Sequence, residues 1–556
     1  AASGAAVTVA LLPALLPAMA RAAPVDCADP GSISAAVIDA HGQVTMIMQG
    51  MPPALFVLGL VLVIVASFVV VERVGTRPAS PWRFNLMKHK RIYAIVRNRW
   101  FQVVPQLALV GVLCFLLYVG LTGSRVRNLM PVAVWTVWWG GLIFMIALAG
   151  PLFCFACPWD GLANLLSRVR IAARVEPLSL GLTPPAWLRT MYPAIVLFVL
   201  LSWAELGLSA TTDPRRTAYM GLGMVALAVL FALLFDGKTF CRNVCPVGRI
   251  SGVYANFSPL EVRARNPRSC RTCTTEDCLN GNERGYPCPV GISLKTVADS
   301  TDCTFCTECV KSCDRQNVAL NLRPFGTDLH AFPASEAHAP RRDAAWMALV
   351  LLALTLFHGL SMTTTWHDPL PGRPSILKWM TVHWGTGEVF NFTVGMAAAM
   401  AIPIALYASS CWVAARLTRA SGVSAGVIFG RYAFALLPIA LFYHLAHNAM
   451  HVLMEGGGVV PLLSDPFGDG RDWFGTAALH IGHLVSESTL WTLQLALVLV
   501  GHVFGVVVAH RISRRLFADR RQALLSLVPM TAVMVLVSVA GLSLMAVDMS
   551  MRMGRV

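Results

Sequence analysis

Charged residues are scarce in this chain of 556 residues. They make up 13% of the sequence, against about a quarter in an average soluble domain, whereas 56% of the residues are hydrophobic. This composition excludes a typical soluble protein and predicts a protein of the lipid bilayer. Neither a Rossmann G-x-G-x-x-G motif nor a Walker phosphate loop occurs in residues 241–340. Direct NADH or ATP chemistry is therefore not expected.

Ten apolar runs are long enough to cross a bilayer, which takes about 20 helical residues. The sequence therefore predicts a mainly α, polytopic membrane protein with about ten spans. The predicted spans lie near residues 52–71, 104–122, 131–153, 190–210, 217–236, 343–361, 389–412, 426–454, 477–509 and 524–546.

These spans divide the chain into four regions. Residues 1–50 form an N-terminal segment, 51–240 a first membrane domain, 241–340 an insert rich in cysteine, and 341–556 a second, histidine-rich membrane domain. The apolar stretch at 5–20 is followed by small residues, as a signal peptide is at its cleavage site. It is either such a signal or an uncleaved membrane segment.

Basic residues collect in the loops on one side of the predicted spans, which the positive-inside rule assigns to the cytoplasm. We therefore predict a bacterial inner-membrane protein whose insert is cytoplasmic and whose termini are both periplasmic. The same loops account for the net charge of +15, so no nucleic-acid partner is expected. A basic face for an acidic redox protein is the alternative. The basic stretches are 73–99, 168–174, 416–419 and 511–521.

Eight cysteines of the insert form two runs. The runs are Cys270-x2-Cys273-x4-Cys278-x9-Cys288 and Cys303-x2-Cys306-x2-Cys309-x3-Cys313. The second run has the spacing of bacterial ferredoxins, and the first is a stretched form of it.

Each iron–sulfur cluster needs four thiolates, and in two-cluster ferredoxins the fourth cysteine of each run ligates the other cluster. The sequence thus predicts two [4Fe–4S] clusters. Zinc sites and disulfides also use C-x2-C pairs, but a C-x2-C-x2-C-x3-C run is not typical of zinc. The predicted ligands are a first cysteine set, Cys270, Cys273, Cys278 and Cys313, and a second cysteine set, Cys303, Cys306, Cys309 and Cys288.

Two further cysteine pairs, each followed by proline, lie where the third and fifth predicted spans end. Together they place four thiols at one predicted depth, where they could hold a further metal or cluster, form a redox disulfide or shuttle an ion. Structural cysteines at helix ends are the alternative. The pairs are Cys154-x2-Cys157-Pro158 and Cys241-x3-Cys245-Pro246.

Helix-end Cys-Pro motifs followed by a two-cluster cysteine pattern resemble the membrane polyferredoxins of the NapH, NosR and CcoG type. The resemblance covers about 130–325, with its motifs in 154–158, 241–246 and 270–313. It implies electron transfer at the bacterial inner membrane, together with other membrane subunits and a periplasmic redox protein or metalloenzyme.

The chain departs from that family in three ways. Its first Cys-Pro pair is C-x2-C-P, where the NapH and NosR types usually have C-x3-C-P. Cys313 is followed by Asp314 rather than proline, as in the CcoG-like pattern. No segment resembles the periplasmic flavin domain of NosR, so a covalent flavin is not expected.

Histidines gather near the predicted outer face of the second membrane domain. Those of the eighth span have the helical spacing i, i+3 and i+7 and share one face. Because the eighth and ninth spans are antiparallel neighbours, His447 could lie level with His483, and His451 with His480. The histidines are His444, His447 and His451 on the eighth span, His480 and His483 at the start of the ninth, and His358 near the outer end of the sixth.

Intramembrane histidines are costly and indicate function by default. Facing imidazoles at matched depth are the usual arrangement for bis-histidine haem b. Histidine clusters also bind non-haem metals or line an ion pathway, and some are hydrogen-bonded core residues.

The predicted clusters and histidines are separated by a hydrocarbon core of about 30 Å. A carrier is needed between them, and the Cys-Pro thiols, a haem or a quinone could serve. We predict an electron-transfer subunit that connects a cytoplasmic or quinone pool with a periplasmic redox partner, rather than a stand-alone enzyme. The alternatives are a transport or assembly factor for iron or copper, and an enzyme that itself oxidises quinol.

Overall fold

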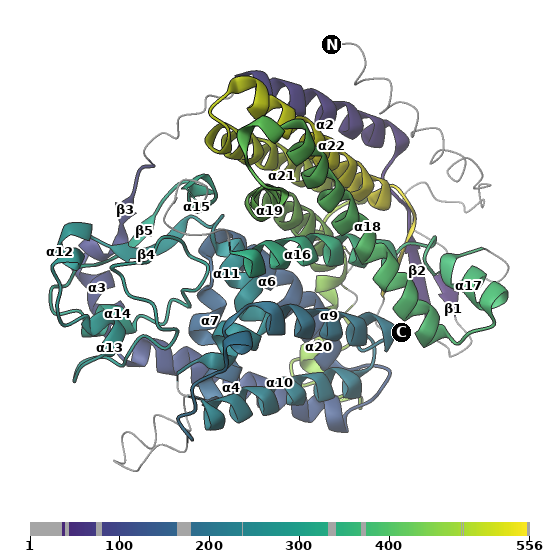
Figure 1. The fold of residues 1–556 in the computed structure, drawn as a ribbon. Helices are drawn as coiled ribbons and strands as arrows, with labels where there is room; N and C mark the ends of the chain where they lie inside the picture. Colours follow the sequence, from purple (N-terminus) through teal and green to yellow (C-terminus); the bar gives the residue numbers. More distant parts are fainter. Residues whose placement is uncertain are drawn as a thin grey trace.

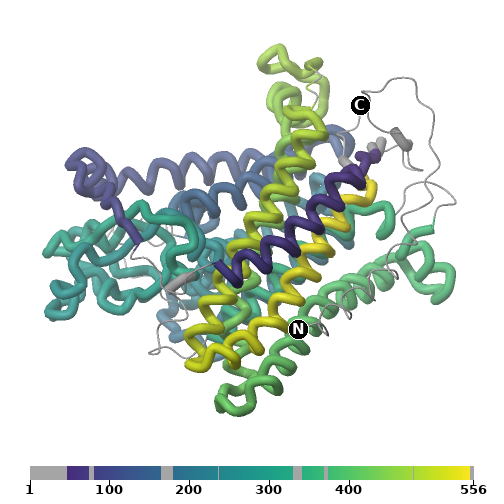
Figure 2. Tube along the Cα trace, turned by 90° about the horizontal axis from the view of Figure 1, so that it is seen from above, coloured from purple at the N-terminus to yellow at the C-terminus, as the bar shows by residue number. Residues whose placement is uncertain are grey.

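The computed structural model describes residues 36–38, 44–73, 81–163, 179–235, 237–331, 341–367, 374–479, 481 and 483–552. The signal-like stretch at 5–20 and the basic residues 168–174 lie outside these ranges. The described chain is mainly α-helical, as predicted, with two small sheets. Figures 1 and 2 show a large body of helices with a smaller, loop-rich part at its left.

Nine helical segments of the described residues are long and apolar enough to cross a membrane. Each matches a predicted span, although the ends differ by several residues. They are α2 (Pro53–Arg73), α4 (Trp100–Thr122), the run from α5 through α6 (Leu129–Ala149), α10 (Pro214–Leu234), α16 (Arg342–Ser361), α18 (Glu388–Leu417), the run from α19 through α20 (Ala425–Ser464), α21 (Glu487–Leu516) and α22 (Arg520–Met545).

The one remaining predicted span, 190–210, is the fourth along the chain. It forms the shorter helix α9 (Tyr192–Gly207), which has 16 residues. It nevertheless follows α16 along its length. At one end the backbone N–H of Met191 donates to Asp343 Oδ2 over 3.1 Å. At the other end Glu205 Oε2 lies 3.6 Å from His358 Nε2. The two helices therefore run side by side in the same direction.

Polar caps decide where several long helices begin. The side chain of Ser424 accepts a hydrogen bond from the N–H of Val427 at the start of α19. At the start of α22, the side chain of Asp519 accepts one from the N–H of Gln522. Ser486 caps α21, which therefore begins at Glu487. The prediction that the ninth span starts near residue 477 was wrong, because the helix begins ten residues after that point.

Both ends of the described chain meet in one antiparallel sheet. Its strands are ordered β1 (Ala36–Ile38), β2 (Val44–Met48) and β6 (Met549–Arg552). Thr363, just after α16, forms a bridge with Met549 of β6. The sheet therefore lies at the C-terminal end of α16, at the right of Figure 1.

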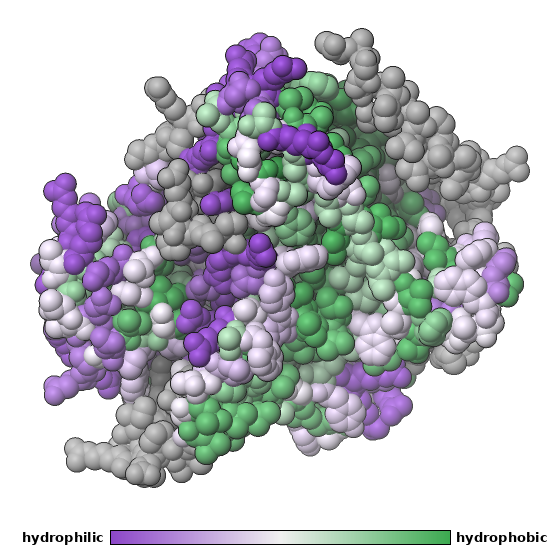
Figure 3. Space-filling view, viewed as in Figure 1, coloured by the Kyte–Doolittle hydropathy of each residue, from purple (hydrophilic) through white to green (hydrophobic). Residues whose placement is uncertain are grey.

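The cysteine-rich insert lies at the opposite, N-terminal end of α16. We call its described part, residues 241–331, the ferredoxin segment. A three-stranded antiparallel sheet supports it, in the order β3 (Phe84–Asn85), β5 (Val318–Leu322) and β4 (Leu260–Ala264). Hydrophilic residues gather over this part, and hydrophobic residues cover much of the helical part (Figure 3). Its short helices are α11 (Pro246–Ala255), α12 (Pro267–Arg271), α13 (Asp277–Asn280), α14 (Glu308–Ser312) and α15 (Thr327–Ala331).

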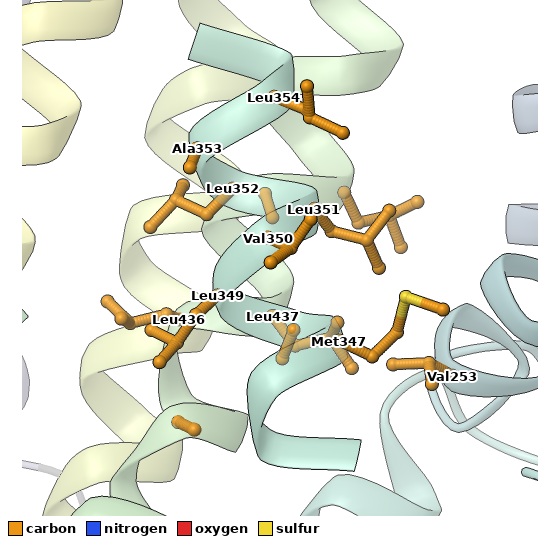
Figure 4. Packing of buried hydrophobic residues seen from close by; sticks show 14 of the residues in the cluster. Val253, Met347, Leu349, Val350, Leu351, Leu352, Ala353, Leu354, Leu436 and Leu437 are labelled. Carbon is orange, nitrogen blue, oxygen red and sulfur yellow. The ribbon is translucent and has the colours of Figure 1, made fainter. Parts of the chain in front are cut away.

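The core of the helical part is built around α16, which is apolar on every side. Leu349, Leu351 and Leu354 are each at most 1% exposed. Leu436 and Leu437 of α19 pack beside this helix, and Val253 of α11 faces it from the ferredoxin side (Figure 4). A helix that is hydrophobic all round belongs in the interior of a bundle, and α16 connects the ferredoxin segment directly to that interior.

Asp302 ties the ferredoxin segment to the membrane helices. Its carboxylate lies 2.6 Å from Arg249 Nη1 on α11 and 3.0 Å from Arg341 Nη1 before α16. Burial opposes ionisation of Asp302, but the two arginines outweigh it and lower the pKa of this carboxyl to about 2. Beside it, a Cβ on Gly252 would lie 1.9 Å from the Thr301 carbonyl oxygen, so only glycine allows α11 to approach the backbone at Thr301 this closely.

The Asp302→Asn variant should be destabilised by about 3 kcal/mol, because it leaves the guanidinium of Arg249 buried without its counter-charge. Thermal unfolding in detergent, followed by circular dichroism, measures this. In the wild-type protein the contribution of Asp302 is present above about pH 4 and is lost as the pH falls toward about 2. The control is Asp469→Asn, which breaks an exposed pair with Arg471 and should cost at most about 1 kcal/mol. Equal losses in the two variants would contradict the docking role of Asp302.

Candidate functional site

The four cysteines of the second set line one cavity. Cys288, Cys303, Cys306 and Cys309 all border a cavity of about 150 Å³ whose other walls are mostly apolar. Such a shell limits water access and is one means by which a protein sets the potential of an iron–sulfur cluster. The structure thus brings the fourth cysteine of the first run to the first three of the second run.

The first cysteine set is also grouped, but nearer to the surface. The charges of Cys313 and Cys273 act on Cys270, and those of Cys313 and Cys270 act on Cys278. Asn317 binds two of these thiols: its Nδ2 donates to Cys270 Sγ over 3.2 Å, and its backbone N–H to Cys313 Sγ over 3.4 Å. Hydrogen bonds to sulfur of this kind tune cluster potentials.

The backbone within both runs adopts conformations that non-glycine residues rarely occupy. Phe305 and Thr307, which flank Cys306, have φ of 54° and 63°. Glu276, before Cys278, has φ of 47°. Such conformations cost free energy, and they cluster at functional sites, where the surroundings hold them. Here they turn successive cysteines toward a common centre.

Burial raises the pKa of thiols in both sets. It raises the pKa of Cys303 to about 12, and it also raises the pKa of Cys309. By contrast, hydrogen bonds, first from the backbone of Glu276, lower the pKa of Cys273. The deeply buried thiols stay protonated unless a cation replaces the proton, which is the usual coupling between metal binding and thiol ionisation.

The two Cys-Pro motifs converge on an ion pair that the sequence analysis missed. Asp160 and Lys238 meet over 2.6 Å and are almost fully buried. The Sγ–H of Cys241 donates to Asp160 Oδ1 over 3.8 Å, and Gln106 Nε2 donates to Asp160 Oδ2 over 3.0 Å. The charges of Cys245 and Cys157 also act on Cys241. Thiols of both motifs therefore surround one centre, which we call the Cys-Pro centre.

Lys238 lies between the Cys-Pro centre and the second cysteine set. Its backbone N–H donates to the carbonyl oxygen of Pro289, the residue after Cys288, over 2.8 Å. A Cβ on the preceding Gly237, which has φ of 69°, would lie 3.0 Å from the same oxygen. Burial raises the pKa of Cys306, and the Lys238 charge opposes this increase. The two thiol sites are therefore neighbours.

Within the described residues, no group of three or more His, Cys, Asp or Glu side chains is arranged to hold a single metal ion. An iron–sulfur cluster sets a different requirement, because its thiolates bind separate iron atoms and stand farther apart than the ligands of one ion. The cysteine sets described above satisfy the grouping that a cluster requires.

A second cavity, of about 720 Å³, opens between the membrane helices beside the Cys-Pro centre. Pro158 and Pro246, which follow the two cysteine pairs, both line it. Its walls are predominantly apolar and include Trp135, Trp138 and Phe198. Cavities of this size and character hold small ligands.

Several polar groups line this cavity, among them those of Trp159, Glu205 and Thr217. The indole Nε1 of Trp159 is buried and has no hydrogen-bond acceptor among the described residues. Glu205 is 7% exposed, and Thr217 accepts a hydrogen bond from Trp135 Nε1 over 3.0 Å. A buried indole N–H usually has a partner, so this unpaired donor in the cavity wall is unusual.

Three of the predicted histidines form a row with two carboxylates. Glu205 contacts His358 as described above, and the rings of His358 and His447 have centroids 6.0 Å apart. His447 and His451 follow at 5.0 Å, and His451 Nδ1 lies 3.0 Å from Glu455 Oε2. The row begins at the cavity, which Glu205 lines, and ends at Glu455 after α19. We call it the histidine row.

The remaining histidines lie apart from this row. His483 precedes α21 instead of starting it, and its Nδ1 bonds to the carbonyl oxygen of Met454 over 3.0 Å. We expected His447 and His483 to lie at the same depth on two facing helices. This arrangement is not formed, because α21 begins only after Ser486 and His483 therefore lies outside a helix. His480 lies outside the described residues. His444 packs against Trp139 and lies with Nδ1 3.5 Å from the Tyr254 hydroxyl.

Comparison with known protein families finds one match, to a 4Fe-4S binding domain, over residues 132–174 and 217–261. These segments contain both Cys-Pro motifs and the helices that precede them. The eight cysteines at 270–313 follow the second matched segment. The match supports iron–sulfur binding by this chain and confirms the family resemblance that its motifs predict.

Several curated proteins are similar to parts of the chain. The ferredoxin-type protein NapH of Escherichia coli is 27% identical over 201 residues, which cover 32% of this chain and 65% of NapH. The regulatory protein NosR of Pseudomonas aeruginosa is 26% identical over 236 residues, or 39% of this chain and 31% of NosR. The chain thus spans less than two thirds of the length of either relative. No solved structure matches it.

The residues missed in the sequence had weak signals. Asp160 and Lys238 each stand three residues from a Cys-Pro cysteine, and Glu205 is an acidic residue inside an apolar run. A charge so close to a cysteine pair or within a membrane helix is costly and favours function. What the sequence could not give is their partners, which come from segments far apart in the chain.

Proposed function

We propose that this membrane protein, which carries a 4Fe-4S binding domain and resembles NapH and NosR, passes electrons between a quinone in its membrane cavity and redox partners on either side of the membrane. The ferredoxin segment would hold two [4Fe–4S] clusters and lie in the cytoplasm of a bacterium, with both termini in the periplasm. The periplasmic partner would be a redox protein or metalloenzyme, reached with the help of other membrane subunits.

The cavity bordered by Cys288, Cys303, Cys306 and Cys309 carries this proposal. It joins four thiols from two separate runs around one space with apolar walls. Clusters bound in this way supply one-electron redox chemistry. The protein supplies their positions: Asn317 binds two thiols of the first set, and Ile292 donates its N–H to Cys288 Sγ over 3.4 Å.

The location of the second cavity supports a quinone as the membrane carrier. A quinone has an apolar body and carbonyl oxygens, which match the aromatic walls and the free donor of Trp159. Glu205 at the same cavity could exchange the protons that accompany quinone redox chemistry. The cavity borders the prolines of both Cys-Pro motifs, so an electron would have a short path to the thiols there.

The Cys306→Ser variant tests the clusters. The purified wild-type chain should contain about eight iron and eight acid-labile sulfide, and the variant about half of each, since two four-iron clusters are expected. Cys114→Ser is the matched control, because Cys114 lies on α4 outside both sets. Wild-type protein without sulfide, or a variant with undiminished iron, would refute the proposed cluster ligands.

The Trp159→Phe variant tests the quinone site, since it keeps an aromatic ring but removes the indole donor. Losing one hydrogen bond worth about 1 kcal/mol should raise the apparent KM for a soluble quinol analogue about fivefold. Cluster reduction by the quinol, followed by visible absorbance, provides the rate. Trp187→Phe, at an exposed position, is the control. An unchanged KM for Trp159→Phe would show that this donor does not bind the quinone.

The histidine row favours a second candidate function, an ion path through the membrane domain. A row of imidazoles with a carboxylate at each end can pass protons, and the same groups also bind divalent metals. His358 and His451 each face a carboxylate, and His447 lies between their rings. This arrangement suits a path that begins at the quinone cavity better than it suits a haem between His447 and His483. A metal transport role would use the same row.

The His447→Ala variant interrupts the histidine row at its centre. We expect slower proton release during quinol oxidation in reconstituted vesicles, measured with a pH-sensitive dye, while the iron–sulfur spectrum is retained. A reduced-minus-oxidised spectrum of both proteins provides the contrasting outcome. A b-type α-band that is present in the wild type and lost in the variant would establish haem ligation and reject the ion path.

A further inference from the structure

Four exposed arginines surround the first cysteine set. Three of them come from the segment that holds Cys270, and the fourth follows Cys313. The charge of Arg315 acts on both Cys270 and Cys273. Its guanidinium also donates to the Ser269 carbonyl oxygen over 2.8 Å, which fixes it over this loop. We call these residues the arginine surface: Arg265, Arg268, Arg271 and Arg315.

The other charges of this region are mostly paired with each other. Arg284 forms an ion pair with Asp314, and Lys295 forms one with Glu276 over 3.2 Å. Asp277 and Glu283 add two carboxylates to the same loop. Among the side chains other than the cysteines, four arginines against these two carboxylates give this surface an excess of positive charge.

This surface lies at the outer edge of the protein. Helix α12, which carries Arg268 and Arg271, is at the far left of Figure 1, on the side of the ferredoxin segment away from the helical part. Cys270 and Cys273 are partly exposed there, whereas the second set faces Lys238 and the Cys-Pro centre. The first set is therefore the one that a soluble partner can approach.

We propose that the arginine surface docks an acidic one-electron carrier protein and orients it toward the first cysteine set. The inference rests on the proposed electron-transfer function and adds the partner class and its docking site. A positive patch around an exposed redox site raises the encounter rate with an acidic protein, and the effect decreases with salt. A carrier of the flavodoxin or ferredoxin kind, with a carboxylate-rich face, fits this chemistry.

Anionic lipid headgroups would also be attracted to arginines. The location favours a protein, because α12 lies at the edge of the ferredoxin segment away from the main body of helices (Figure 1). A juxtamembrane lipid site would instead be expected close to the helix ends, where a surface potential acts within about a Debye length.

The test is a charge reversal of Arg268→Glu with Arg271→Glu in the full chain, reconstituted in nanodiscs of neutral lipid. Stopped-flow absorbance follows cluster reduction by a reduced, acidic two-cluster ferredoxin. We expect the rate at low salt to fall about tenfold or more, and the difference to shrink as salt is added. The control is Arg520→Glu with Arg521→Glu, which makes the same charge change at the exposed start of α22 and should leave the rate within about twofold.

A second donor separates the possible failures. The methyl viologen radical cation should reduce the charge-reversed variant at least as fast as the wild type, since the arginines no longer repel it. If methyl viologen reduces neither protein, the clusters are absent and the proposed function fails. If methyl viologen works but the ferredoxin rates are equal, the docking site is refuted. A rate loss that appears only in nanodiscs with anionic lipid would assign the arginines to lipid and equally overturn the proposal.

Discussion

The carboxylate of Asp302 is the constraint on which the arrangement of the redox sites depends. It stands next to Cys303 and binds Arg249 of α11 within the ferredoxin segment and Arg341 at the start of α16. Gly252 lets the backbone of Thr301 pack against α11 without an intervening side chain. Electron transfer weakens steeply with distance, so a domain that carries clusters is useful only if it is held rigidly against its acceptor. A buried ion pair with a close backbone contact provides that rigidity.

The three thiol sites lie in different surroundings. The first cysteine set lies at the outer edge of the ferredoxin segment, the second borders a cavity with apolar walls, and the Cys-Pro centre lies at the ends of membrane helices. Each step meets a different local dielectric, and the potentials of successive sites can differ without any change in ligand type.

The sequence predicted the parts of this structure that depend on local spacing. Hydrophobic runs located nine of the spans, and cysteine spacing assigned Cys288 and Cys313 to opposite sets, as the structure groups them. The start of α21 was missed because hydropathy does not register the cap at Ser486. The pairing of Asp160 with Lys238, and of Glu205 with His358, could not be foreseen, since each pair joins segments whose proximity exists only after folding.

The ion pair of Lys238 and Asp160 is also an oriented dipole between two thiol sites. Its ammonium acts on Cys306, whereas its carboxylate is the stronger influence on Cys241. The net charge of the pair is close to zero. Its electrostatic potential is nevertheless positive beside Lys238 and negative beside Asp160. Along the proposed electron path, this orientation would favour an extra electron near Cys306 over one near Cys241. Electron transfer from the ferredoxin segment toward the membrane would therefore need a driving force that exceeds this electrostatic difference.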